Sequence, residues 1–357
     1  MKKVLVLVLA FAMVFCMFAC GEKEDPQPEV TTYEIACVTD VGQLMDGSFN
    51  QYTWAGCEAY AKANGLNAKY YQPANGAQAT DDDRIKAMRD ACAAGAQAIV
   101  TPGFLQATAI DTVAKEYPNV QFVFIDGWDM GMANVVGVAY QEEQAGYLAG
   151  YAVVKEGFEK LGFSGGGGGT NPACIRYGYG FAQGANAAAA EMGKTVEMRY
   201  SWEYGASFSA SDDLQAMING WFNAGTEICF MCGGTMFNSG VAAAEANSAK
   251  IVGVDVDQSA QAAAGTVVTS AMKGLTASVQ TALGNFYKSG LQTGELRLGA
   301  KDDAVGLPVD TWSLKNWSVA DYNALFTKIV SGEVVVDNNS EMADPSTAGL
   351  ANVKFVK

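Results

Sequence analysis

Short apolar runs alternate with alanine-rich amphipathic segments along most of this 357-residue chain. Short apolar runs bounded by turns are typical of buried strands, whereas apolar positions three and four residues apart are typical of helices. Strands that alternate with helices indicate parallel sheets with helices on both faces. The sequence therefore predicts an α/β fold.

The expected elements run from residue 33 to residue 289. Strands are expected at 33–38, 68–71, 98–100, 120–125, 135–139, 160–164, 195–200, 227–231, 251–254 and 266–269. Helices are expected at 49–64, 79–94, 106–117, 141–156, 177–191, 210–224, 239–247 and 275–289. Because about 320 residues exceed one ordinary domain, we expect two such halves. Side by side, they would leave a ligand cleft along the carboxyl ends of their strands.

The first twenty residues carry the pattern of a lipoprotein signal. Two lysines precede an uncharged apolar stretch at 4–18, and Ala19 stands directly before Cys20. This pattern predicts export, removal of a signal peptide at 1–19 and acylation of Cys20, with an uncleaved anchor as the alternative. The polar, proline-containing stretch at 20–32 predicts a flexible tether. We therefore expect an exported protein that its lipid holds at the outer face of the cytoplasmic membrane or on the periplasmic side.

Composition argues against several classes of function. The formal net charge is −15, and loss of the two signal-peptide lysines would make it more negative. Such acidity argues against nucleic acid and anionic lipid surfaces as partners. The chain has no histidine, which excludes Ser-His-Asp and Cys-His catalysis and removes the commonest metal ligand. We expect neither a metal nor a cofactor.

Cysteines give one local motif, the CxxC spacing of Cys229 and Cys232. The motif lies in an apolar run that is typical of a buried strand, and we find no second ligand pair for zinc. We therefore expect inert core thiols rather than a redox or metal site. An exported protein can instead pair some of its cysteines, and spacing alone does not show which.

The stretch from Asp46 to Gln51 follows the first expected strand and is dense in polar groups. Together with Asp40 it brings carboxylates, a hydroxyl, the Phe49 ring and the Asn50 amide to the start of a helix. Such a set suits a small ligand that needs stacking and hydrogen bonds. The alternative is a capped helix, with Asp46 or the next hydroxyl as the cap and Phe49 in the core. The spacing favours neither.

Acids also end two other expected strands, at Asp126 and Asp255. These carboxylates could accept hydrogen bonds from ligand NH and OH groups or cap helices. Lys273 could bond ligand hydroxyls or neutralise a buried acid. Phe208 lies in a loop, where its ring could stack on a planar base or simply pack. Five glycines at 165–169 predict a mobile loop rather than a phosphate-binding loop, because a proline follows at 172.

Seven stretches of the sequence resemble the basic membrane protein family of ABC-transporter substrate-binding lipoproteins, which includes purine nucleoside receptors. The resemblance runs from about residue 33 to about residue 306, and it keeps the order and spacing of the seven stretches. They are Thr39-Asp-Val-Gly, Asp46-Gly-Ser-Phe-Asn-Gln, Phe124-Ile-Asp-Gly, Tyr147-Leu-Ala-Gly-Tyr, Gly180-Phe-Ala-Gln-Gly, Gly253-Val-Asp-Val-Asp-Gln and Thr269-Ser-Ala-Met-Lys.

The resemblance implies a type I periplasmic-binding-protein fold, in which two Rossmann-like lobes joined by a hinge close on a ligand. We expect an N-terminal lobe of 33–137 plus 271–303 and a C-terminal lobe of 138–270 plus 304–357. In members that bind nucleosides, a purine lies between two phenylalanines, which match Phe49 and Phe208. The other implied contacts are Asp40 and Asp126 to the base or sugar, Asp255 and Lys273 to the ribose hydroxyls, and Asn50 and Gly234.

The resemblance further implies a receptor that captures a nucleoside, such as inosine, guanosine or adenosine, for the permease and ATPase of an ABC importer. One alternative is a receptor for ribose or galactose on the same scaffold. A second is an enzyme that hydrolyses a nucleoside with paired acids, which a non-catalytic family disfavours. A third is a sensor or adhesin without a transporter.

Overall fold

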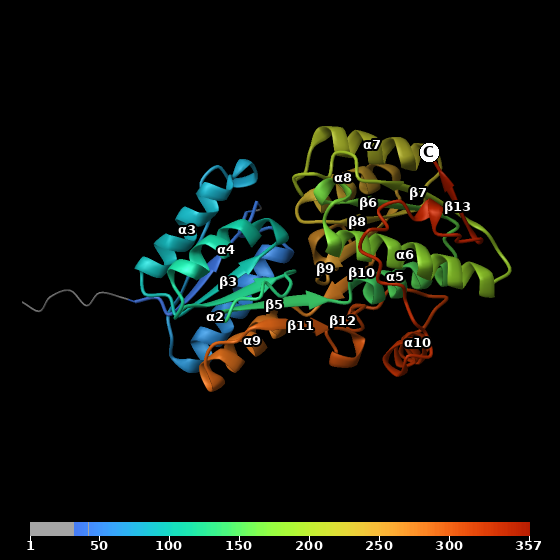
Figure 1. Ribbon diagram of the computed structural model, residues 1–357. Helices are drawn as coiled ribbons and strands as arrows, with labels where there is room; N and C mark the ends of the chain where they lie inside the picture. The colour runs from blue at the N-terminus through green and yellow to red at the C-terminus, as the bar shows by residue number, and fades with distance from the viewer. Residues whose placement is uncertain (1–31, 42) are drawn as a thin grey trace, which may run out of the picture. The chain divides into compact units, whose positions relative to one another are not determined.

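Two mostly parallel sheets with helices on both faces confirm the α/β prediction (Figure 1). The computed structural model describes residues 32–41 and 43–357, and residues 33–357 form one compact unit. The predicted signal peptide, the lipidation site at Cys20 and the tether up to residue 31 lie outside the described residues. Within the described part of the chain, no helix has the length and apolar character that crossing a membrane requires.

The first sheet has six parallel strands in the order β11-β5-β4-β3-β1-β2. Residues in the strands alternate between the two faces, so Ile35 packs toward α2 and α9 while Ala36 packs toward α3 and α4. We call this sheet and its four helices the first lobe. Its elements are β1 (Ile35–Val38), α2 (Phe49–Asn64), β2 (Ala68–Tyr71), α3 (Asp81–Ala93), β3 (Ala98–Pro102), α4 (Ala107–Glu116), β4 (Gln121–Ile125), β5 (Val135–Tyr140), α9 (Leu275–Ser289) and β11 (Gly294–Leu298).

The second sheet has seven strands in the order β12-β10-β9-β8-β6-β7-β13, and β12 alone runs antiparallel to its neighbour. Phe230 packs toward α5 and α6, and Met231 packs toward α7 and α8 on the other face. We call this sheet with its helices the second lobe. Its elements are α5 (Glu142–Glu156), β6 (Lys160–Gly165), α6 (Pro172–Glu191), β7 (Val196–Ser201), α7 (Asp212–Asn223), β8 (Ile228–Cys232), α8 (Met236–Asn247), β9 (Lys250–Asp255), β10 (Val267–Lys273), β12 (Val305–Gly306), α10 (Val319–Ser331) and β13 (Val353–Val356).

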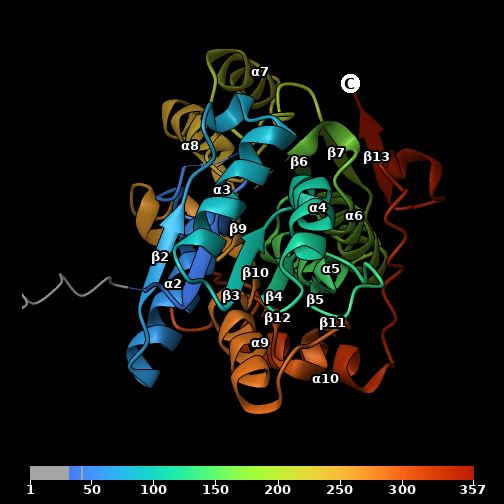
Figure 2. The ribbon, with the colours of Figure 1, turned by 60° about the vertical axis from the view of Figure 1, so that its left-hand side comes forward.

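Helices α5 and α6 lie side by side (Figures 1 and 2) and meet backbone to backbone. Each helix has two glycines four residues apart, which places both on one face. A Cβ at Gly150 would overlap the carbonyl oxygen of Phe181, and one at Gly184 would overlap that of Tyr147. Only glycine allows this close approach. This crossing accounts for the glycines in two of the seven stretches that resemble the family, those that begin at Tyr147 and Gly180.

The chain passes between the two sheets three times: after β5, after β10 and after β11. The lobe limits expected from the sequence, after residues 137, 270 and 303, stay a prediction. The first two of these limits fall inside β5 and β10, each of which belongs to a single sheet.

Most of the expected elements are present, and α2, β2 and α9 have the predicted bounds. The start of α6 is wrong in the sequence prediction, which begins that helix at residue 177. The helix begins at Pro172, with Asn171 as the N-cap. Proline is well suited to the first helical position, where no N–H is needed. The pattern also predicts nothing after residue 289, where the structure adds β11, β12, α10 and β13.

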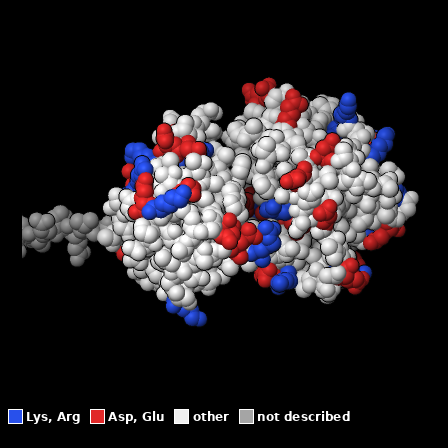
Figure 3. All heavy atoms as spheres, viewed as in Figure 1, with Lys and Arg blue, Asp and Glu red and all other residues white. Residues whose placement is uncertain are grey.

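The surface carries both signs of charge. On the face drawn in Figure 3, Lys and Arg side chains lie scattered among Asp and Glu. Over the whole sequence, 38 acidic residues outnumber 23 basic ones.

Candidate ligand-binding site

A pocket lies where the carboxyl ends of strands from both sheets meet. It contains about 600 Å³ of empty space, counted with the open solvent at its mouth. Residues that end or follow β1, β3 and β4 line it from the first lobe, and residues at the ends of β8, β9 and β10 line it from the second. All eight residues expected from the sequence line this pocket: Asp40, Phe49, Asn50, Asp126, Phe208, Gly234, Asp255 and Lys273. Their contacts with a ligand stay a prediction.

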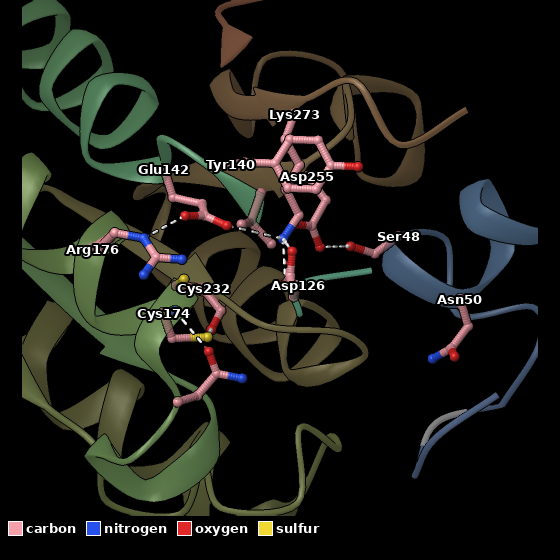
Figure 4. A network of polar contacts seen from close by, with 12 residues as sticks. Ser48, Asn50, Asp126, Tyr140, Glu142, Cys174, Arg176, Cys232, Asp255 and Lys273 are labelled. Atoms are coloured by element: carbon pink, nitrogen blue, oxygen red, sulfur yellow. Dashed lines mark hydrogen bonds and ion pairs between the residues drawn. The ribbon is translucent and has the colours of Figure 1, made fainter. Parts of the chain in front are cut away.

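Lys273 lies at the centre of a buried charge network (Figure 4). Its Nζ is 2.8 Å and 2.6 Å from the two carboxylate oxygens of Asp126. It also lies 3.5 Å from Asp255 Oδ1 and 3.8 Å from Glu142 Oε1. Although burial opposes its charge, these carboxylates, Asp126 foremost, raise the pKa of Lys273. Lys273 therefore neutralises buried acids, which was one of its two predicted roles.

Aromatic rings surround the same ammonium group. Lys273 Nζ lies 4.7 Å from the ring centre of Phe49, 5.3 Å from that of Tyr140 and 5.6 Å from that of Tyr177. Cations at such distances are attracted to the ring faces. Rings and carboxylates together fix the position of the ammonium group in the pocket.

A second cation extends the network away from the pocket. Arg176 Nε donates a hydrogen bond of 2.7 Å to Glu142 Oε2, and Glu143 lies 3.9 Å from the same nitrogen. Burial, and then the neighbouring Glu142, raise the pKa of Glu143 to about 7. The sequence prediction missed this group. Two adjacent glutamates at the start of a largely apolar helix were the available signal.

The helix-cap interpretation of the stretch that begins at Asp46 is confirmed for Asp46, while the ligand-site interpretation stays a prediction. The Asp46 carboxylate caps α2, since it accepts hydrogen bonds from the backbone N–H groups of Ser48 and Asn50 at 2.9 Å and of Gln51 at 3.2 Å. Burial raises the pKa of Asp46 despite these bonds. Phe49 lines the pocket, and its contact with a ligand stays a prediction.

Ser48 links the two lobes. Its hydroxyl donates a hydrogen bond of 2.7 Å to Asp255 Oδ2 at the end of β9 (Figure 4). Nearby, Gln261 Nε2 donates to the backbone oxygen of Gly47 at 2.7 Å. The lobes therefore touch through polar groups at the edge of the pocket.

Three of the predicted site residues have left-handed backbone conformations. The φ angles are +57° at Asp126, +57° at Phe208 and +66° at Asp255. Residues with side chains rarely adopt this region, and such strain clusters at functional sites. No sequence signal announces it, because none of the three residues is glycine.

Two aromatic rings pack against the glycine run at 165–169. A Cβ at Gly166 would overlap the ring of Phe208, and one at Gly165 would overlap that of Trp202. Gly165 and Gly166 are buried. The run therefore holds Phe208 against the pocket, a packing role that the expectation of a mobile loop did not include.

Two thiols also line the pocket, those of Cys174 and Cys232. The strand that carries Cys229 and Cys232 is wholly buried, as predicted. Burial raises the pKa of the Cys229 and Cys232 thiols, which makes these two thiols poor nucleophiles. The six cysteines in the described part of the chain are free, and no group of three or more His, Cys, Asp or Glu residues in that part could hold a metal ion.

The sequence prediction missed the wall that α6 contributes. Asn171, Ala173, Cys174 and Tyr177 line the pocket from the start of this helix. Three of them lie before residue 177, where the predicted helix begins. The dipeptide Asn-Pro at 171–172 was the signal for the true start, since asparagine is a favoured N-cap.

Comparisons with known proteins agree with this architecture. Residues 34–340 match the family model described as "ABC transporter substrate-binding protein PnrA-like". A "CD4+ T-cell-stimulating antigen" from Listeria monocytogenes is 27% identical over 361 residues, which cover 93% of this chain and 97% of that protein. The "ABC transporter nucleoside-binding protein BmpA" of Lactococcus lactis is 25% identical over 276 residues, which cover 72% and 75%.

A solved structure shows the same fold. The ABC transporter solute-binding protein from Aeropyrum pernix superposes with a TM-score of 0.73 at 22% identity, over 89% of this chain and 97% of that one. Since the family model covers most of the chain, the chain is a substrate-binding protein of ABC transporters and belongs to the PnrA-like, or basic membrane protein, family.

Proposed function

We propose that this protein captures a purine nucleoside between its two lobes and delivers it to the permease and ATPase of an ABC importer. The observation that carries the proposal is the position of two phenylalanines. Phe49 comes from α2 of the first lobe, Phe208 comes from the second lobe, and both line the same pocket. Two rings that line one pocket from different lobes suit a planar base, and stacking on one ring is worth about 1–3 kcal/mol.

The charges of the pocket favour a neutral ligand rich in NH and OH groups. Asp40, Asp126 and Asp255 supply carboxylate acceptors, while Lys273, which also lines the pocket, is already paired with Asp126. A phosphorylated ligand would bring negative charge beside these acids. We therefore propose a nucleoside rather than a nucleotide.

We assign the remaining residues the roles that the family resemblance implies. Asp40 and Asp126 hydrogen-bond the base or sugar, Asp255 and Lys273 hold the ribose hydroxyls, and Asn50 and Gly234 make further contacts. The name of the relative from Lactococcus lactis, a nucleoside-binding protein, supports this ligand class.

Ligand binding would favour closure of the lobes. A ligand that touches both halves of a hinged protein stabilises the closed arrangement over the open one. The polar contacts of Ser48 with Asp255 and of Gly47 with Gln261 would form part of that closed arrangement.

We also propose that cleavage before Cys20 and acylation of this cysteine hold the protein at the membrane. The support is the sequence pattern of residues 1–20. The tether that follows would let the receptor reach its permease.

Isothermal titration calorimetry of the purified protein tests the ligand class. Inosine, guanosine and adenosine are compared with hypoxanthine and ribose. We expect at least one nucleoside to bind more tightly than hypoxanthine or ribose binds alone. Phe49→Ala should weaken that binding by about 1–3 kcal/mol through lost stacking. Phe355→Ala, on β13 outside the pocket wall, is the matched control and should leave it unchanged.

Three outcomes would contradict the proposal. Ribose that binds as tightly as any nucleoside would indicate a sugar receptor. Free base released from inosine on prolonged incubation would indicate an enzyme. A silent titration with every nucleoside would reject the class of ligand altogether.

A further inference from the structure

We propose that the hydroxyl of Tyr177 is a further ligand contact of this pocket, which hydrogen-bonds a hydroxyl group on the sugar of the bound nucleoside. The inference rests on the proposed function. Tyr177 lines the pocket and is 1% exposed. Its hydroxyl oxygen is buried and has no hydrogen-bond partner among the described residues. An unsatisfied buried hydroxyl is costly, and a ligand that fills the pocket beside Tyr177 would supply the missing partner.

The surroundings of Tyr177 hold its backbone and its ring in place. A Cβ at Gly146 would overlap the Tyr177 carbonyl oxygen, so the backbone of α6 is seated directly on α5 at this point. The ring packs edge to face against Phe230, with ring centres 6.0 Å apart. Ala173 lies four residues earlier on the same helix face and also lines the pocket. The side chain is therefore fixed by its packing.

Electrostatics indicate which end of the ligand Tyr177 meets. Burial raises the pKa of Tyr177, and Asp255 and Glu142 raise it further. The hydroxyl therefore remains protonated and can donate or accept a hydrogen bond. Lys273 Nζ lies 5.6 Å from the centre of the Tyr177 ring. Since Asp255 and Lys273 are the residues proposed to hold the ribose, Tyr177 lies at the sugar end.

Two other tyrosines, Tyr140 and Tyr200, differ from Tyr177 in the surroundings of their hydroxyl groups. Tyr140 also lies beside Lys273, but its hydroxyl has a partner in Ser278. Tyr200, on β7, has a buried hydroxyl without a partner in the described part of the chain, yet it does not line the pocket. Its ring stacks on Phe163 with centres 4.4 Å apart. Tyr200 is therefore the matched control for the loss of a buried hydroxyl.

Titration calorimetry of Tyr177→Phe and Tyr200→Phe with inosine and its 2′-, 3′- and 5′-deoxy analogues tests the inference. Tyr177→Phe should weaken inosine binding about 2- to 12-fold, the usual worth of one neutral hydrogen bond. Tyr200→Phe should leave the affinity within 2-fold, a margin on the order of the smallest such effect. For one deoxy analogue, the one that lacks the partner hydroxyl, wild type and Tyr177→Phe should bind equally. The melting temperature of ligand-free Tyr177→Phe should equal or exceed that of the wild type.

Equal affinity of wild type and Tyr177→Phe for inosine would overturn the inference and leave the proposed function intact. So would a loss of the same size for inosine and for all three deoxy analogues, because it would indicate a structural effect. A lower melting temperature of ligand-free Tyr177→Phe would show that the hydroxyl has a partner within the protein, and it would also overturn the inference. A wild-type protein that binds no nucleoside would overturn both proposals.

Discussion

Buried charge beside the pocket is unbalanced. Four carboxylates, those of Asp126, Glu142, Glu143 and Asp255, face two cations. Removing one partner of a buried ion pair typically costs about 3–5 kcal/mol, because the other charge is left uncompensated. Because acids outnumber cations here, proton binding at this site changes the free energy of unfolding, which therefore depends on pH.

Glu143→Gln should stabilise the protein at alkaline pH. The pKa of Glu143 is raised from its ordinary value of 4.5 to about 7, so the folded state binds this proton more tightly than the unfolded state. The stability that the proton provides is full below about pH 4.5 and is lost as the pH rises to about 7. At pH 8 the neutral glutamine should raise the free energy of unfolding by roughly 2–3 kcal/mol.

Urea unfolding at pH 4 and pH 8 measures this effect. Glu58→Gln, on the exposed side of α2, is the control and should change little at either pH. A difference between Glu143→Gln and wild type that is the same at both pH values would count against the linkage.

Many residues of the pocket could be predicted one by one, because polar side chains that directly follow apolar strands are recognisable in the sequence. Asp126 and Asp255 were identifiable in this way. Tyr177 was not, because a tyrosine in an apolar stretch is indistinguishable from a core residue. The left-handed backbone at Phe208 could not be predicted either, since it depends on packing against glycines that are distant in sequence.

Among the elements, the crossing of α5 and α6 depends most directly on small residues. It seats Glu142 and Glu143 of one helix and Tyr177 of the other beside the pocket. A side chain introduced at the crossing would push the two backbones apart. The pocket wall would then move with them.

Gly150→Ala should lower the free energy of unfolding by about 1–3 kcal/mol, the usual cost of overpacking a core. Gly220→Ala is the matched control, because this glycine lies on the exposed side of α7 with open space around its Cα. There alanine should raise the free energy of unfolding by about 0.5–1 kcal/mol through its better helix propensity. Thermal or urea unfolding distinguishes the two. A Gly150→Ala variant as stable as Gly220→Ala would show that the helices can separate without cost.

The elements before residue 289 could be predicted because their apolar periodicity is strong. Those after it have weak patterns: β11 is half-buried and partly charged, and β12 has only two residues. The helix α10 was recognisable in principle. Ser318 and Asp321 form a capping box at its start, three residues apart.

At the scale of the whole molecule, the proposed lipid anchor has a direct test. Cys20→Ser should move the protein from the membrane fraction to the soluble fraction, because it removes the acylated residue. The affinity for nucleoside should be unchanged, since the pocket is built from residues 40–273. Fractionation and calorimetry measure the two effects. Cys92→Ser is the control, and a Cys20→Ser protein that still sediments with membranes would refute acylation at this position.

The order of the strands constrains how the protein can be made. The sixth strand of the first sheet, β11, follows β10 of the second sheet in the chain, and β13 completes the second sheet close to the C-terminus. A polypeptide that stops before residue 294 therefore has both sheets unfinished. The first sheet has all its strands once residue 298 has been made, whereas the second still waits for β12 and for β13 at Val353–Val356. During synthesis the second lobe is therefore the last to be completed.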